Sequence, residues 1–188
     1  MEDNCIIDLY WARNESAIEE TKIKYGQYCY TIAYNVLGNK EDADESVNDT
    51  YLGAWNSIPP NKPNPLAAYL GKLARNISLK KWRDKTRVKR GGGQADLTLS
   101  ELGECIPDDS SIEEKLEAKE LAAIVNDFVR NLPEEERRIF VRRYWYMDSV
   151  EDIAKRFDCG KSKIKMKLLR TRNKLSERLE KEGLAYEG

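Results

Sequence analysis

The sequence predicts an all-α protein made of two small helical domains joined by a flexible linker, the C-terminal domain being a helix-turn-helix. Three observations support this class. Apolar residues recur every three or four positions along most of the chain, clusters of Pro and Gly separate these stretches, and no alternating run of note predicts a strand. The 188 residues suffice for two domains with modest cores.

Two helices are expected before the first proline cluster. Apolar positions from Ile23 to Leu37 are spaced by three and four, and Gly38 can end this helix. Asn39 is the expected N-cap of a second, acidic helix. The polar residues expected on the outward face of that helix are Asp42, Asp44, Glu45, Asn48 and Asp49.

A third helix is expected after the segment "IPPNKPNP", whose prolines cannot continue the second one. Asn64-Pro65 makes an N-cap and first turn. The expected buried stripe consists of Leu66, Leu70, Leu73 and Ile77. Residues 91–111 follow with three glycines and little periodicity, which predicts a flexible acidic linker between a domain at 1–90 and a domain at 112–188.

The C-terminal domain is expected to begin near Ser110-Ser111 and to break at Leu132-Pro133. Ser149 and Asp152 form a possible capping box for a short helix, Gly160 lies in a tight turn, and Ser162 starts a basic helix. A short helix, a turn and a basic helix predict a helix-turn-helix, whose second helix enters the major groove of DNA.

The basic helix is amphipathic. Its apolar stripe consists of Ile164, Leu168, Leu175 and Leu179, and it is expected to pack on Ile139, Phe140 and Tyr144. This packing would hold the Lys and Arg side chains outward, toward phosphate. The alternative is a solvated helix in a bundle, which is common for any charge-rich helix.

The net charge of −1 conceals a pattern of alternating blocks. Residues 61–95 carry ten basic and one acidic side chain, and residues 137–188 carry fifteen and eight. The acidic blocks 1–60 and 96–136 precede and separate them. Two basic blocks of this kind indicate two anion-binding surfaces.

The first basic block interleaves its cations with Tyr69, Asn76 and Trp82. Cations follow a nucleic-acid backbone, aromatic rings stack on unpaired bases, and an amide can bond a base edge. The alternative is that Tyr69 and Trp82 are core residues. The acidic helix before this block is either solvated or docks on a basic protein.

Several classes of function are disfavoured. The chain has no His, and its four Cys lie far apart, so neither a zinc site nor a disulfide framework is expected, and no metal or cofactor is implied. No nucleophile–base pair or phosphate loop is evident, so we expect no enzyme. No apolar run approaches the ~20 residues that span a bilayer, and the acidic N-terminus is unlike a signal peptide. A cytoplasmic protein without membrane insertion is expected.

Three segments in order, "DADESVNDTYLGAW", "LAAYLGKLARN" and "LPEEERRIFVRRYWYMDSVEDIAKRFDCGKSKIKMKLLRTRNKL", resemble bacterial RNA polymerase sigma factors of the extracytoplasmic-function (ECF) group. The resemblance covers most of the chain, from about Tyr25 to Leu179. It implies core RNA polymerase and promoter DNA as partners, and in many members an anti-sigma factor that clamps the two domains.

The resemblance also implies roles for particular residues. The residues implied to bind the clamp helices of the largest polymerase subunit are Asp44, Asn48, Asp49, Tyr51 and Leu52. Recognition of the minus-ten element as a single strand falls on Asn61, Lys62, Asn64, Tyr69, Arg75, Asn76, Lys80 and Arg83. Recognition of the minus-thirty-five element as a duplex falls on Ser162, Lys163, Lys165, Lys167, Arg170 and Arg172.

The chain departs from the family pattern at a few positions. Lys80 stands where the family usually has an acid, Asn48 where it has Gln, and Met166 where it has Ser. These departures bear on the exact minus-thirty-five sequence, which the chain does not specify, more than on the role. The sequence therefore predicts a sigma factor that directs promoter recognition, DNA melting and initiation. The alternative is a helix-turn-helix regulator that binds duplex DNA without the polymerase.

Overall fold

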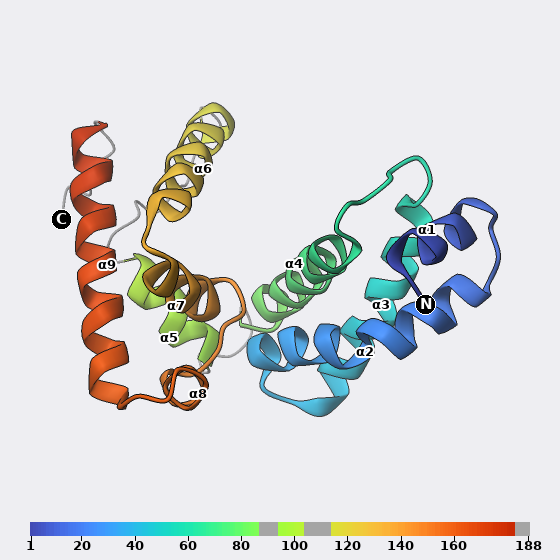
Figure 1. The fold of residues 1–188 in the computed structure, drawn as a ribbon, viewed down its shortest axis with the longest axis horizontal. Coiled ribbons are helices and arrows are strands. Elements are labelled where there is room, and N and C mark those ends of the chain that lie inside the picture. Colours follow the sequence, from blue (N-terminus) through green and yellow to red (C-terminus); the bar gives the residue numbers. More distant parts are fainter. Residues whose placement is uncertain (87–93, 104–113, 183–188) are drawn as a thin grey trace. The chain divides into compact units, whose positions relative to one another are not determined.

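Helices are the regular elements of the part of the chain that the computed structural model describes, which is residues 1–86, 94–103 and 114–182. The chain divides into two units, Met1–Ala95 and Asp96–Gly188 (Figure 1). The all-α prediction with two helical units is confirmed.

The N-terminal unit contains four helices: α1 (Asp3–Trp11), α2 (Ser16–Leu37), α3 (Lys40–Ser57) and α4 (Leu66–Thr86). Helices α2, α3 and α4 pack against one another, and α1 packs against α2 (Figure 1). Fully buried side chains from all four helices form the core: Ile6, Tyr10, Ala17, Cys29, Ile32, Ala33, Ala43, Ala54, Leu66, Leu70 and Ala74. Burial raises the pKa of the Cys29 thiol to about 12, so this cysteine is an unreactive core residue.

Helix α2 differs most from its prediction. It begins at Ser16, seven residues earlier than expected, and Ile23, the first of the regularly spaced apolar positions, is 70% exposed. The buried face instead includes Thr21, whose hydroxyl shares a hydrogen bond of 2.9 Å with Tyr10 of α1, a helix that was not predicted. Since α1, α3 and α4 all contact α2, its buried positions do not form one narrow stripe.

The turn between α2 and α3 follows the prediction. Gly38 has φ +71°, the left-handed conformation that ends helices, and Asn39 Oδ1 accepts a hydrogen bond from the Asp42 N–H at 2.9 Å. Asp42, however, is buried instead of facing outward, and its carboxylate accepts hydrogen bonds from Asn39 and from Lys85 of α4. These bonds lower the pKa of Asp42, the Lys85 bond most strongly.

The C-terminal unit contains α5 (Gln94–Gly103) except for its first two residues, and α6 (Glu114–Asn131), α7 (Glu134–Tyr144), α8 (Val150–Arg156) and α9 (Lys161–Lys181). The predicted break at Leu132-Pro133 separates α6 from α7. The predicted stripe of α9 is 2% exposed or less at all four positions. It packs in one cluster with Leu132, Ile139, Phe140, Tyr144, Ile153 and Ala154, so the prediction of this packing is confirmed.

The helix-turn-helix is formed by α8 and α9. Ser149 Oγ accepts a hydrogen bond from the Asp152 N–H and donates one to its carboxylate, which confirms Ser149 as the N-cap of α8. Gly160 is the N-cap of α9, which therefore begins at Lys161, one residue before Ser162.

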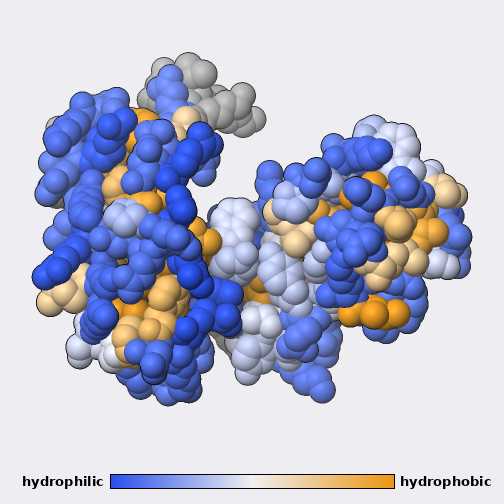
Figure 2. Space-filling model, in the orientation of Figure 1, coloured by the Kyte–Doolittle hydropathy of each residue, from blue (hydrophilic) through white to orange (hydrophobic). Residues whose placement is uncertain are grey.

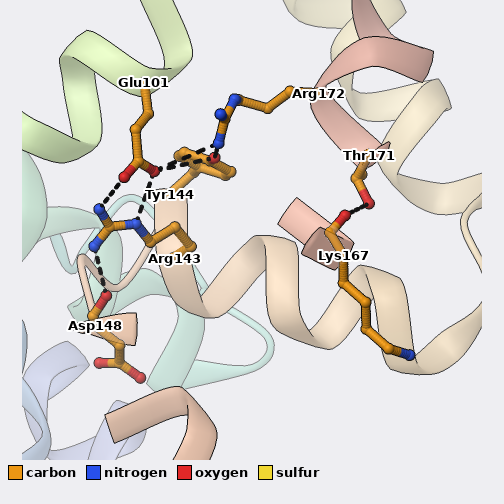
Figure 3. A network of polar contacts seen from close by, with 7 residues as sticks. All are labelled: Glu101, Arg143, Tyr144, Asp148, Lys167, Thr171 and Arg172. Atoms are coloured by element: carbon orange, nitrogen blue, oxygen red, sulfur yellow. Dashed lines mark hydrogen bonds and ion pairs between the residues drawn. The ribbon is translucent and has the colours of Figure 1, made fainter. Parts of the chain in front are cut away.

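The prediction of a flexible linker at 91–111 is wrong for Gln94–Gly103, which forms α5. Residues 91–93 and 104–111, including the expected helix start at Ser110-Ser111, lie outside the described residues. Glu101 of α5 holds Arg143 of α7 through two hydrogen bonds, of 2.6 and 3.0 Å (Figure 3). The Arg143 side chain is only 3% exposed and also donates to the Asp148 carbonyl at 3.1 Å. A buried guanidinium needs such acceptors, and α5 supplies the carboxylate.

Hydrophilic residues cover most of the face of each unit that Figure 2 shows, with smaller hydrophobic patches between them. Within the described ranges, no helix has the length and hydropathy needed to cross a membrane.

We predict that Glu101→Ala destabilises the C-terminal unit by about 2 kcal/mol, because Arg143 would stay buried without its carboxylate. Hydrogen exchange of α7 and α9 in the full chain measures this effect. Leu97→Ala is the matched control on α5, since Leu97 is 60% exposed. Equal protection in Glu101→Ala and Leu97→Ala would show that the contact adds nothing to stability.

We also predict that the effect of Lys85→Met depends on pH. The Lys85 hydrogen bond depresses the pKa of Asp42 below its ordinary value of 3.8, so the stabilisation is complete above that pH and is lost as the pH falls through the lowered pKa. The Lys85 side chain is 59% exposed, so the penalty at pH 6 should be below about 1 kcal/mol.

Urea unfolding of the N-terminal unit, followed through the amide NMR signals of α3, measures this penalty at several pH values. It should shrink toward zero at the lowest pH at which the unit stays folded. A penalty that stays constant over the whole range would assign Lys85 a packing role instead of an electrostatic one.

Candidate nucleic-acid interface

The outward face of α9 combines cations with apolar and small polar side chains. Lys163, Lys165 and Arg170 are exposed, and none of the three forms an ion pair with a described residue. Between them lie Ser162, Met166, Leu169 and Asn173, all exposed. Because the opposite face of α9 is anchored in the core, this face is fixed outward with its charges available to an anion.

Other cations of α9 are paired within the unit. Lys167 Nζ lies 2.6 Å from Glu135 of α7, and Lys174 Nζ lies 2.9 Å from Glu136. The Lys167 bond, together with the charges of Lys167 and Lys163, lowers the pKa of Glu135, so this carboxylate stays ionised at neutral pH. These pairs align α7 with α9 and neutralise one flank of the helix.

Arg172 is also held inside the unit (Figure 3). Its guanidinium donates to the Tyr144 hydroxyl at 2.9 Å and lies 3.7 Å from the Glu101 carboxylate, and its side chain is 14% exposed. Burial raises the pKa of Tyr144 to about 12, so the hydroxyl remains protonated. Among the six predicted duplex-binding residues, Arg172 is thus the least accessible, and Lys167 follows it.

A second cationic face lies on α4 of the N-terminal unit. Lys72, Asn76, Lys80 and Arg83 are exposed at intervals of four, four and three, so they share one side of the helix. Tyr69 and Arg75 are half-buried beside it. Burial, and then the charge of Arg83, lowers the pKa of Arg75. The exposed cations of this face favour an anionic ligand.

The loop before α4 presents the predicted residues Asn61, Lys62 and Asn64 to solvent. Asn61 Nδ2 donates to the Ser57 carbonyl at 2.9 Å, and the Tyr69 hydroxyl donates to Ser57 Oγ at 2.6 Å. Ser57 thereby ties the loop to the start of the cationic face of α4. The loop side chains and this face belong to one continuous segment of the N-terminal unit.

The predicted polymerase-binding residues lie on α3. Asp44, Asn48, Asp49 and Leu52 are exposed, Leu52 at 57%, whereas Tyr51 is 7% exposed and belongs mainly to the core. A groove of about 570 Å³ lies on one side, lined by Asp49, Leu52 and Ile77 among others. Another of about 590 Å³ lies on the other side, lined by Asn48, Tyr51, Leu52 and Trp55 among others. Leu52 borders both and forms an apolar ridge between the exposed Asp44 and Asp49 of α3. The first groove is also lined by lysines of α4, namely Lys80, Lys81 and Lys85.

Three residues of these faces were missed by the sequence prediction. Lys72 shares the face of Asn76 and was detectable from its spacing of four. Met166 was noted only as a departure from the family pattern, and Leu169 was not singled out, because exposed apolar side chains cannot be told from core residues in the sequence alone. In the described part of the chain, no group of His, Cys, Asp and Glu can hold a metal ion.

Two protein families match parts of this chain. Residues 23–88 match the family described as Sigma-70 region 2, and residues 122–175 match the family described as Sigma-70, region 4. No curated protein matches the chain at a significant level. A solved structure described as "Structure of CnrH in complex with the cytosolic domain of CnrY" is 21% identical, with a TM-score of 0.41 and coverage of 95% of this chain and 97% of that chain.

The two family matches occur in order, one in each helical unit, and together span most of the chain. Sigma factors are not enzymes; they give the RNA polymerase its promoter specificity. The chain belongs to the sigma-70 family and has the two-domain architecture of the ECF sigma factors, which direct promoter recognition and transcription initiation.

Proposed function

We propose that this sigma factor divides its work among three surfaces. The face of α9 binds the minus-thirty-five element as a duplex, the face of α4 with its preceding loop binds the minus-ten element as a single strand, and α3 docks on the clamp helices of the largest polymerase subunit. The observation that carries the proposal is the presence of two exposed cationic helix faces on two separate units.

The α9 surface suits a duplex. A helix held by its neighbours at a fixed angle can enter the major groove, as the second helix of this motif does. Lys163, Lys165 and Arg170 are placed to meet phosphate, and Ser162 lies at the N-terminal end, where recognition helices contact bases. Lys167 and Arg172 support this surface through their contacts with Glu135, Tyr144 and Glu101.

The α4 surface suits unpaired nucleotides. Lys72, Lys80 and Arg83 can follow a backbone, Tyr69 offers part of a ring for stacking, and Asn76 can hydrogen-bond a base edge. Asn61, Lys62 and Asn64 at the loop would contact a base that has left the stack. A preference for unpaired bases on this surface would stabilise melted promoter DNA.

The α3 surface suits a helical partner. An apolar ridge at Leu52 with a groove on each side fits a helix or coiled coil, and the flanking Asp44 and Asp49 select a basic one. We place the protein in the cytoplasm, where the core polymerase works. An anti-sigma factor that covers these surfaces stays a prediction.

The competing function is that of a helix-turn-helix regulator that acts without the polymerase. The apolar ridge of α3 with its neighbouring acidic residues and the cationic face of α4 have no role in such a regulator. A pull-down with purified core polymerase separates the two: a stable complex at moderate salt supports the proposal, and its absence supports the regulator.

We predict that Asp49→Arg weakens binding to core polymerase about tenfold, because it places a like charge against a basic partner. Fluorescence titration of labelled sigma factor with core polymerase measures the affinity. Asp8→Arg on α1 is the matched control, since Asp8 is exposed and outside the α3 surface. If both variants lost affinity for the core polymerase to the same extent, the effect would come from net charge alone. If Asp49→Arg lost no affinity, this face of α3 would be a solvated surface and not a binding site.

We predict that Asn76→Ala slows open-complex formation on a duplex promoter about tenfold, with a much smaller effect on a pre-melted promoter. The reason is that its hydrogen bond to an unpaired base, worth about 1.4 kcal/mol, would be formed during melting. Lys72→Ala on the same face is the control and should weaken binding to both templates alike. If Asn76→Ala reduced both templates equally, Asn76 would have no part in melting.

A further inference from the structure

We propose that Met166 and Leu169 read thymine methyl groups in the duplex that α9 binds. This inference rests on the proposed function of α9. It adds a chemical prediction for the bound sequence: thymines lie opposite these two side chains in the major groove.

The first observation is the exposure of these side chains. Met166 is 50% exposed and Leu169 is 44% exposed, although the neighbouring stripe of α9 is fully buried. Neither side chain is needed in the core, which Ile164, Leu168, Leu175 and Leu179 already fill. Exposed apolar area of this size gains free energy when a partner covers it.

The second observation is their position. Met166 lies near the centre of the outward face, opposite the buried stripe, and Leu169 lies next to it at i+3. The exposed cations Lys163, Lys165 and Arg170 flank them. Cations that meet the phosphates on either side of the groove leave the side chains between them against the base edges.

The third step is the chemistry of the groove. Among the groups that base pairs present in the major groove, the C5-methyl of thymine is the apolar one, whereas guanine, adenine and cytosine present donors and acceptors. A Met or Leu against those polar groups would leave them without hydrogen bonds. Thymine is therefore the base that these two side chains select. An apolar protein partner would be disfavoured by the surrounding positive charge.

The test uses holoenzyme reconstituted from the full-length chain and core polymerase. Duplexes that it binds are selected from a random pool, and each thymine of the minus-thirty-five region in the selected duplex is replaced by uracil, which removes only the methyl group. Loss of one methyl contact should weaken binding about fourfold. The effect should appear at one or two adjacent positions.

Met166→Gln and Leu169→Ala should each abolish the uracil effect at one of these positions. Met166→Gln keeps the length of the side chain and replaces its apolar end, and both sites are on the surface, so folding is preserved. Lys165→Ala is the control: it should weaken binding with a lower salt dependence while the uracil effect persists. This separates methyl reading from phosphate contact.

Two results would overturn the inference. One is a selected duplex without a fixed thymine in this region, and the other is an uracil effect that Met166→Gln and Leu169→Ala leave unchanged. In either case the holoenzyme would still bind and transcribe selected promoters, so the proposed function would stand. A holoenzyme that selects no duplex at all would instead contradict the proposed function.

Discussion

Burial of the apolar stripe of α9 is the constraint on which the proposed DNA-binding surface depends. Ile164, Leu168, Leu175 and Leu179 have at most 2% of their area exposed, and together they fix the rotation of the helix about its axis. Apart from the buried Thr171, the other positions of α9 then lie on a flank or on the outward face. Without this anchoring the helix would be an ordinary charged helix, free to turn any side to solvent.

Ion pairs inside each unit then determine which cations remain available to bind an anionic partner. In the C-terminal unit, Glu135 and Glu136 of α7 pair with one flank of α9, and Glu101 of α5 holds Arg143 and Arg172. In the N-terminal unit, Asp42 and Glu45 of α3 pair with Lys85 and Lys81 of α4. The acidic blocks of the sequence thus neutralise part of each basic block, and the rest forms two separate surfaces.

Much of this arrangement was predictable from local patterns. Gly38, Asn39, Ser149 and Leu132-Pro133 mark helix ends through backbone chemistry that acts within a few residues, and the stripe of α9 follows from regular spacing. The face of α2 was not predictable, because three helices pack around it and its buried positions include Thr21 and Cys29. Helix α5 was also missed, since a long-range ion pair to Arg143 supports it instead of strong periodicity.

The site was predicted at the level of segments more than of single residues. Asn76, Lys80, Lys163, Lys165 and Arg170 are exposed as expected, but pairing of Lys167 and Arg172 depends on partners 28 to 71 residues away in the chain. Sequence spacing carries no information about such contacts. The same holds for Asp42, which looks like a surface residue until Lys85 is placed beside it.

The salt dependence of holoenzyme binding to a minus-thirty-five duplex tests most directly which cations of α9 contact DNA and which are held by internal carboxylates. Alanine substitution of Lys163, Lys165 or Arg170 should each lower the slope of log affinity against log salt by about one, whereas Lys167→Ala, Arg172→Ala and Lys174→Ala should leave it nearly unchanged. An equal decrease of the slope for all six variants would show that pairing with internal carboxylates does not keep any of these cations from contacting DNA, and would contradict the account.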